Sequence, residues 1–203
     1  MDKNVPIWVW RNNQDTPNFA SKKLSNMTSE EKRLIVDCRI MVIGATDFID
    51  KVKTELIKSG FMSINIVLAS DGQTGIGTVD MVIEYVGDVY DSIKEEVKIP
   101  IIYPFDFVDG VGAIVIMPGD DNELQCKDNM RLWVAEYMTG YCAFWNVDGC
   151  DWLQSALPTI REGKTSEAAQ RTAAHICAKI AANIAVGRNV KHFPRFYLCK
   201  NLE

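Results

Sequence analysis

The sequence predicts an α/β protein whose mostly parallel sheet carries helices on both faces. Short β-branched runs alternate with amphipathic segments through the middle of the chain, and the part beyond about residue 128 is mostly helical. The composition, 47% hydrophobic and 24% charged over 203 residues, is typical of a globular protein. We therefore expect one domain over residues 1–203, with an N-terminal arm over 1–30, a core over 32–119 and a helical part over 128–187.

The first part of the chain contains one apolar run and one helix start. Val5–Trp10 is apolar and aromatic, which fits an edge strand or an arm that packs on a partner. Residues 12–26 are polar and are expected to be irregular. Thr28 and Glu31 have the spacing of a capping box, so a short helix should follow as far as about Val36.

A βαβ unit follows this helix. Arg39–Ile43 is a β-branched run that ends at Gly44, which predicts a buried strand. Asp47 can cap a helix that ends at Gly60, and Ser63–Ala69 predicts a second strand, parallel to the first because such crossovers are right-handed. The apolar residues of this helix share one face: Phe48, Ile49, Val52, Leu56 and Ile57.

Five more elements complete the central part of the chain. They are a glycine-rich loop over Asp71–Gly77, a strand over Asp80–Val86, a helix over Asp88–Val97, and two further strands over Pro100–Phe105 and Val111–Met117.

The C-terminal part is expected to hold long helices and a short last segment. Met130–Val147 is apolar on nearly every face, which predicts a buried helix or a subunit contact. Ser166–Val186 carries a stripe of mostly small residues and ends at Gly187, so this helix can approach a neighbour closely. Arg195–Cys199 fits a last strand or a tail.

Four passages resemble the ThiF/MoeB/E1 superfamily, whose members adenylate the C-terminus of a ubiquitin-like or sulfur-carrier protein. In chain order they are Cys38–Gly44, Leu56–Val67, Asp80–Val86 and Ile99–Gly119. They lie mainly within residues 32–119. The resemblance implies a Rossmann-like sheet in a shortened and degenerate relative of these activating enzymes.

The turn after the first strand of the core departs from the pattern of this family. There a G-x-G-x-x-G turn lets backbone amides approach the phosphates of the nucleotide. Here Thr46 and Ile49 stand at the second and third glycine positions after Gly44. Asp47, as the helix cap, would occupy those amides and would also repel a phosphate.

Other ATP-binding groups of the family are missing or displaced. Leu68 stands where an acidic residue binds the ribose, although Asp71 could substitute if its loop curls back. The long crossover whose arginine and lysine bind the triphosphate has no counterpart. The Mg²⁺-coordinating aspartate aligns with Gly87, one position before Asp88.

The resemblance therefore implies a nucleotide site with five candidate residues. Gly44, Thr46, Asp47 and Asp71 would bind the cofactor, and Asp88 would be a catalytic acid beside the metal of the nucleotide. The alternative is that residues 44–47 merely start a helix and that Asp88 caps the next one. No cofactor is predicted unless the chain is active, in which case the cofactor is ATP with Mg²⁺.

Several residues outside this site have two interpretations. The Gly72–Gly77 loop fits a ligand flap or a flexible connection. Cys126 lies where some relatives form a thioester, but the acids around it would raise the pKa of its thiol. His175 fits a packed structural histidine, and His192 fits an anion site or a solvated loop. Four carboxylates that flank the last strands fit either a cation or amine site or a solvated surface: Asp106, Asp109, Asp120 and Asp121.

Other classes of site are disfavoured. The net charge of −5 and the lack of a Lys/Arg run disfavour nucleic-acid binding. No metal site is predicted, because the six cysteines form no C-x-x-C pair, and we expect them to be buried thiols. Without a signal-peptide pattern or a long apolar run, the expected location is the cytoplasm, with no contact to a membrane.

Three functions are consistent with this sequence. The preferred one is an E1-like protein that has lost ATP-dependent adenylation and acts as a non-catalytic partner of a small ubiquitin-like or peptide molecule. The alternatives are an active enzyme that adenylates the C-terminal carboxylate of a small carrier protein or peptide, and a binder of another nucleotide or small metabolite. A homodimer is expected in each case, because the Met130–Val147 helix and the aromatic residues Trp8 and Trp10 offer more apolar surface than one domain covers.

Overall fold

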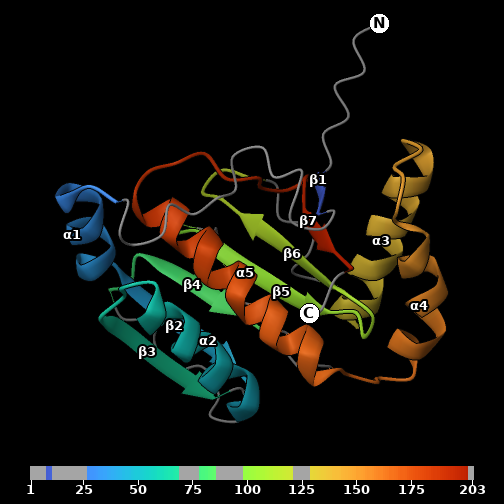
Figure 1. Cartoon of the computed structure of the whole chain (residues 1–203), viewed down its shortest axis with the longest axis horizontal. Coiled ribbons are helices and arrows are strands. Elements are labelled where there is room, and N and C mark those ends of the chain that lie inside the picture. Colours follow the sequence, from blue (N-terminus) through green and yellow to red (C-terminus); the bar gives the residue numbers. More distant parts are fainter. Residues whose placement is uncertain (1–7, 11–26, 69–77, 86–97, 121–128, 201–203) are drawn as a thin grey trace, which may run out of the picture.

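The computed structural model describes residues 8–10, 27–68, 78–85, 98–120 and 129–200. These residues form one sheet between two layers of helices (Figure 1). The predicted α/β fold, with a mostly parallel Rossmann-like sheet, helices on both faces and a helical C-terminal part, is confirmed. Four of the predicted features lie outside the described residues: the irregular segment 12–26, the loop Asp71–Gly77, the helix Asp88–Val97 and Cys126.

The sheet has seven strands. They are β1 (Trp8–Trp10), β2 (Arg39–Gly44), β3 (Ser63–Leu68), β4 (Met81–Glu84), β5 (Ile101–Asp106), β6 (Val111–Ile116) and β7 (Tyr197–Cys199). Their order across the sheet is β1-β7-β6-β5-β4-β2-β3. β2 pairs in parallel with β3 on one side and with β4 on the other, and β5 continues the parallel pairing beside β4.

The other half of the sheet is partly antiparallel. β5 and β6 form an antiparallel hairpin, and β7 pairs antiparallel with β6. β1 then pairs in parallel with β7 at the edge. The two open interpretations of the ends of the chain are therefore decided: the Val5–Trp10 run provides an edge strand over Trp8–Trp10, and the Arg195–Cys199 segment provides a strand.

Five helices are present in the described residues: α1 (Ser29–Asp37), α2 (Thr46–Lys58), α3 (Met130–Phe144), α4 (Asp151–Arg161) and α5 (Glu167–Ala185). The predicted capping box of α1 is formed, since the Thr28 Oγ1 accepts from the Glu31 N–H and the Glu31 carboxylate accepts from the Thr28 N–H. Ser166 caps α5, and Gly187 follows its end with a φ of 70°. Gly60, with a φ of 95°, ends α2 as predicted.

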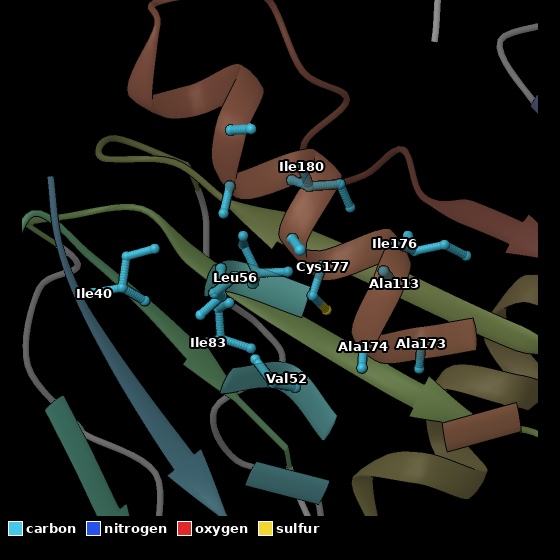
Figure 2. Packing of buried hydrophobic residues seen from close by; sticks show 14 of the residues in the cluster. Ile40, Val52, Leu56, Ile83, Ala113, Ala173, Ala174, Ile176, Cys177 and Ile180 are labelled. Carbon is cyan, nitrogen blue, oxygen red and sulfur yellow. The ribbon is translucent and has the colours of Figure 1, made fainter. Parts of the chain in front are cut away.

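Alternate residues of the strands pack into two separate hydrophobic cores, one on each face of the sheet. Ile40 and Val42 of β2 belong to the core under α1, α2 and α5, whereas Met41 and Ile43 belong to the core under α3 and α4. Figure 2 shows the small residues of α5, among them Ala174 and Cys177, directed at the sheet and α2. The predicted close approach of this small-residue helix is thereby confirmed.

α3 is buried on only one side. Val134, Met138 and Cys142 are buried in the core that α3 shares with α4. At its C-terminal end Phe144 is 76% exposed and Trp145 is 48% exposed. Of the two interpretations of this segment, a buried helix holds for the face of α3 that packs on the core but not for its exposed C-terminal end, and the subunit contact stays a prediction.

Candidate functional site

The candidate site lies at the carboxyl ends of β2 and β4. Here the strand order reverses, because the chain leaves β2 for β3 on one side and β4 returns on the other. Ligands of open α/β sheets bind outside the strands at such a switch point. The residues of this switch-point site are Gly44, Thr46, Asp47, Phe48 and Tyr85.

The turn from β2 to α2 differs from the prediction. The N-cap of α2 is Ala45, in an extended conformation, and no side chain caps the helix. Asp47 is the second residue inside the first turn, where its carboxylate does not accept the capping hydrogen bond. The predicted Asp47 cap is therefore wrong, because the chain enters the helix directly after Ala45. The amides of Phe48 and Ile49 donate instead to the Ala45 carbonyl, at 3.1 and 3.0 Å.

The charges near the start of α2 oppose anion binding. A helix N-terminus acts as roughly half a positive charge, which is worth about 0.3–1 kcal/mol to a nearby anion at a surface. The exposed Asp47 carboxylate in the same turn carries a full negative charge and outweighs it. The nearest ammonium on α2, that of Lys51, is held by the Asp47 carbonyl at 3.1 Å and by the Gln170 side chain at 3.4 Å.

An aromatic pair stands beside the turn. The rings of Phe48 and Tyr85 are stacked, with centroids 4.0 Å apart and an interplanar angle of 18°. A Cβ added at Gly44 would lie 3.0 Å from the Tyr85 Cβ, which is tighter than most real Cβ contacts, so Tyr85 would have to move by a few tenths of an ångström. Gly44 therefore fits the close approach of Tyr85 to the turn.

A buried carboxylate precedes Tyr85 in β4, on the opposite face of the sheet from the aromatic pair. Glu84, the last residue of β4, is 1% exposed, and its Oε1 has no hydrogen-bond partner. Burial raises the pKa of Glu84 to about 7, while a hydrogen bond with Tyr103 of β5 opposes part of that rise. The sequence analysis missed Glu84, although an acid inside the apolar run Met81–Tyr85 is a signal of a buried ionisable group.

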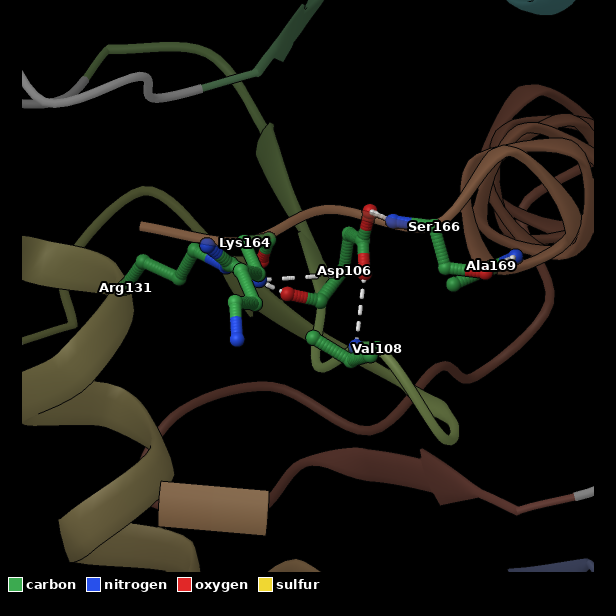
Figure 3. Close-up of polar contacts among 6 residues, drawn as sticks. All are labelled: Asp106, Val108, Arg131, Lys164, Ser166 and Ala169. Atoms are coloured by element: carbon green, nitrogen blue, oxygen red, sulfur yellow. Dashed lines mark hydrogen bonds and ion pairs between the residues drawn. The ribbon is translucent and has the colours of Figure 1, made fainter. Parts of the chain in front are cut away.

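A second buried carboxylate, Asp106, ends β5 and is bound on every side (Figure 3). It is fully buried and accepts the N–H groups of Val108 and Ser166, each at 2.7 Å. The Arg131 guanidinium of α3 lies 3.8 Å from this carboxylate, donates from Nε to the Asp106 carbonyl and donates from its terminal nitrogen to the Lys164 carbonyl. Burial raises the pKa of Asp106, and these N–H groups and the Arg131 charge oppose the rise. Asp106 therefore joins β5, α3 and the start of α5.

Of the four flanking acids, the three that the structure describes do not gather at one place. The Asp106 carboxylate already accepts the N–H groups of Val108 and Ser166, and Asp109 is exposed. Asp120 follows β6. Because β6 runs antiparallel to β5, Asp120 lies near the amino end of β5, whereas Asp106 lies at its carboxyl end. The two carboxylate oxygens of Asp120 are each 2.9 Å from the His192 Nδ1. Asp121 lies outside the described residues.

Both histidines bind carboxylates of the chain itself. His175 is not packed in the core as expected: its side chain is 52% exposed and its Nδ1 is 2.8 Å from Glu55 of α2. The reason is that the helix position next to the apolar stripe faces the neighbouring helix rather than the sheet. The anion that His192 contacts is Asp120, within the same chain.

The cysteines of the described residues are buried, as predicted for these five: Cys38, Cys142, Cys150, Cys177 and Cys199. Burial raises the pKa of the Cys38 thiol to about 11, which suppresses its reactivity as a thiolate. Within the part of the chain that the structure describes, no group of three or more His, Cys, Asp or Glu side chains could hold a metal ion.

Two candidate site residues, Asp71 and Asp88, lie outside the described residues, as does the Gly72–Gly77 loop. The structure brings Gly44, Thr46 and Asp47 together at the switch point, with Thr46 and Asp47 exposed. Of the helices that the structure describes, none has the length and apolar character needed to cross a membrane. Comparison of the sequence with protein-family models finds no match, and comparison with curated proteins finds no similar protein.

Proposed function

We propose that this chain is a ThiF/E1-like protein that has lost ATP-dependent adenylation and acts as a non-catalytic binding partner of a small ubiquitin-like protein or peptide. The observation that supports the loss is the switch-point site. Its turn has Thr46 in place of the second glycine, its helix start carries the exposed Asp47, and Tyr85 stands beside Gly44. Each feature disfavours a polyphosphate at the place where the fold would hold one.

Calorimetric titration with ATP and Mg²⁺ tests the loss directly. We expect no binding up to about 1 mM nucleotide, and a micromolar Kd for the unaltered protein would overturn the proposal. A second titration, with pyrophosphate, tests the effect of the Asp47 charge. Asp47→Asn should bind pyrophosphate several-fold more tightly than the unaltered protein, because the repelling charge is removed. The matched control is Asp50→Asn, an exposed carboxylate of the same helix beyond its first turn. Equal effects of the two variants would contradict the role of Asp47.

The partner is tested separately from the nucleotide. Small ubiquitin-like and sulfur-carrier proteins are titrated into the protein without ATP, and the same mixtures are assayed for ATP–pyrophosphate exchange. The proposal expects binding of a carrier and no exchange. Exchange with any carrier would overturn it in favour of the active enzyme, and the absence of both signals would remove the carrier as partner.

The active adenylating enzyme remains a second candidate because of one observation. α2 has no side-chain cap, so the Asp47 carboxylate does not occupy the amides of the first turn. An adenylating version would place ATP with Mg²⁺ at Gly44 and Thr46, and would use Asp71 and Asp88. Pyrophosphate exchange that is lost in Asp88→Asn would establish this candidate.

We also propose that the chain forms a homodimer and works in the cytoplasm. Large apolar side chains are exposed at three places in the described residues: on α1, on α2 and β3 with the residue before that strand, and at the end of α3. Such exposed apolar surface marks interaction sites on otherwise stable domains. Light scattering on the purified protein that detects only monomer would count against the dimer.

A further inference from the structure

β3 forms one edge of the sheet in the described residues (Figure 1). It is six residues long and pairs with β2 at every position without a bulge. Its sequence, Ser63–Leu68, contains no charged residue and no proline. Edge strands are usually protected by charge, proline, a bulge or shortness, because their open N–H and C=O groups recruit other strands. The opposite edge strand, β1, is short at three residues, whereas β3 has none of these protections.

Apolar side chains are exposed beside this strand. Ile66 at its centre is 42% exposed, and Met62 and Ile57 are 76% and 54% exposed. Ile64 and Leu68, two positions to either side of Ile66, pack on the core that includes α2. Because side chains alternate along a strand, Ile66 shares their face of the sheet. We call Ile57, Met62 and Ile66 the β3 edge patch.

We propose that two copies of this chain pair along β3, antiparallel, into one continuous sheet. A two-fold axis perpendicular to the sheet at Ile66 places this residue opposite its own counterpart. On the same face Ile64 of one copy meets Leu68 of the other, and on the opposite face Asn65 meets Val67. All of these pairs are uncharged and most are apolar. The strand is therefore complementary to itself, as an interface about a two-fold axis requires.

The charges of α2 favour an identical copy over a foreign strand. Asp50 and Lys53 are both exposed, and helical spacing puts them on the same side of α2 as Ile57. The same axis runs the two copies of α2 antiparallel, so that Asp50 of each copy is directed toward Lys53 of the other. This inference rests on the homodimer proposed above and names the surface through which the two copies bind. It does not depend on whether a nucleotide binds.

A charge-swap experiment at Ile66 tests the proposal on the full chain. Light scattering and sedimentation should find a dimer for the unaltered protein between about 1 and 100 μM. Ile66→Lys and Ile66→Glu should each raise the dimer Kd by roughly tenfold or more, because an apolar pair is lost and like charges then face each other at the axis. An equimolar mixture of the two variants should recover a dimer that contains one copy of each. A foreign partner strand cannot produce this recovery.

Two further measurements separate the possible failures. Phe144→Lys changes an apolar residue of α3 that is more exposed than Ile66, at 76% against 42%, and should leave the dimer intact. If Phe144→Lys dissociates the dimer while Ile66→Lys does not, self-association stands and the β3 interface is overturned. A monomer at every concentration overturns both. If the Ile66 variants do not fold, amide exchange decides: residues 62–68 of the unaltered protein should become protected as the concentration rises, and unchanged exchange in a dimer would overturn the proposal.

Discussion

Two adjacent strands of the sheet, β4 and β5, end in buried carboxylates with opposite surroundings. Asp106 accepts two backbone N–H groups and lies beside the Arg131 guanidinium. Glu84 has a hydrogen bond with Tyr103 but leaves its Oε1 without a partner. A buried polar atom without a partner costs about 1–3 kcal/mol, whereas a satisfied one costs little. The end of β5 is thus a structural joint, and the end of β4 keeps an acid that stability alone does not favour.

The difference teaches how to separate structural acids from candidate functional ones. An acid whose lone pairs are filled by backbone N–H groups fixes the elements that supply them. An acid with an unfilled oxygen and a pKa near neutrality can exchange a proton in the physiological range. Glu84 is the last residue of the strand that ends at the switch point, although its side chain faces the core under α3 and α4 and not the Tyr85 ring.

The largest expected effect comes from removing the Asp106 carboxylate. Asp106→Ala leaves the N–H groups of Val108 and Ser166 without their acceptor and takes the carboxylate away from the Arg131 guanidinium, which keeps its bonds to the carbonyls of residues 106 and 164. It should lower the free energy of unfolding by about 3–5 kcal/mol. Urea unfolding followed by circular dichroism measures this. Asp109→Ala, at an exposed position of the same hairpin, should change the value by less than about 0.5 kcal/mol. Similar losses for the two variants would mean that the joint contributes little.

The second prediction concerns the pH dependence caused by Glu84. Its pKa is raised from 4.5 to about 7 in the folded protein, so the folded state holds the proton more tightly than the unfolded chain does. The stabilising contribution of protonation is full below about pH 4.5 and is lost as the pH rises through about 7. Between pH 5 and pH 8 this loss should amount to roughly 2–3 kcal/mol.

Glu84→Gln should remove that loss, because glutamine has no proton to release. Unfolding free energies at pH 5 and pH 8 for the variant and the unaltered protein measure the difference in slope. Glu30→Gln, an exposed acid of α1, serves as the control and should leave the slope unchanged. An undiminished slope in Glu84→Gln would show that Glu84 does not titrate near neutrality.

A smaller effect on stability is expected when the hydrogen-bond partner of Glu84 is removed. Tyr103→Phe deletes the hydrogen bond to this carboxylate and should raise the pKa of Glu84 further. The cost should be about 1.5–2 kcal/mol at pH 8, where the acceptor is charged, and about 1 kcal/mol or less at pH 5. Urea unfolding at both values tests this, with Tyr141→Phe of α3 as the control. Equal costs at the two pH values would exclude a bond to the charged form.

The smallest expected effect concerns Ser166, which both caps α5 and donates a hydrogen bond to Asp106. The Ser166 hydroxyl accepts from the Ala169 N–H, while the Ser166 N–H donates to Asp106. Ser166→Ala removes the cap alone and should cost about 1 kcal/mol. Ser155→Ala, on the exposed side of α4, should cost less. A loss as large as that of Asp106→Ala would mean that the variant disturbs the backbone bond as well.

Features set by neighbouring residues were predictable from the sequence. The capping box at Thr28 and the ends of helices at Gly60 and Gly187 depend on a few adjacent positions, and each was found where expected. The buried strands were also predictable, because β-branched runs between turn residues have few other structures available.

Features that depend on distant residues were not predictable. Asp106 stood out only as one of four acids near strand ends, since its partners Arg131 and Ser166 are 25 and 60 residues away. His175 binds Glu55 across 120 residues. The start of α2 was misplaced by a local choice: Asp is a preferred N-cap, but the extended Ala45 already ends the strand and leaves Asp47 inside the helix. The antiparallel pairing of β5 with β6 also has no sequence signal as strong as the strands themselves.

The place of β7 has a consequence for biosynthesis. β6 leaves the ribosome well before its neighbour β7, because α3, α4 and α5 are all translated between them. Until Tyr197–Cys199 emerges, the all-buried strand Val111–Ile116 has its hairpin partner on one side and nothing of the final sheet on the other. The sheet of the nascent chain is therefore incomplete until β7 is translated. Only then can β7 pair with β6 on one side and with β1 on the other.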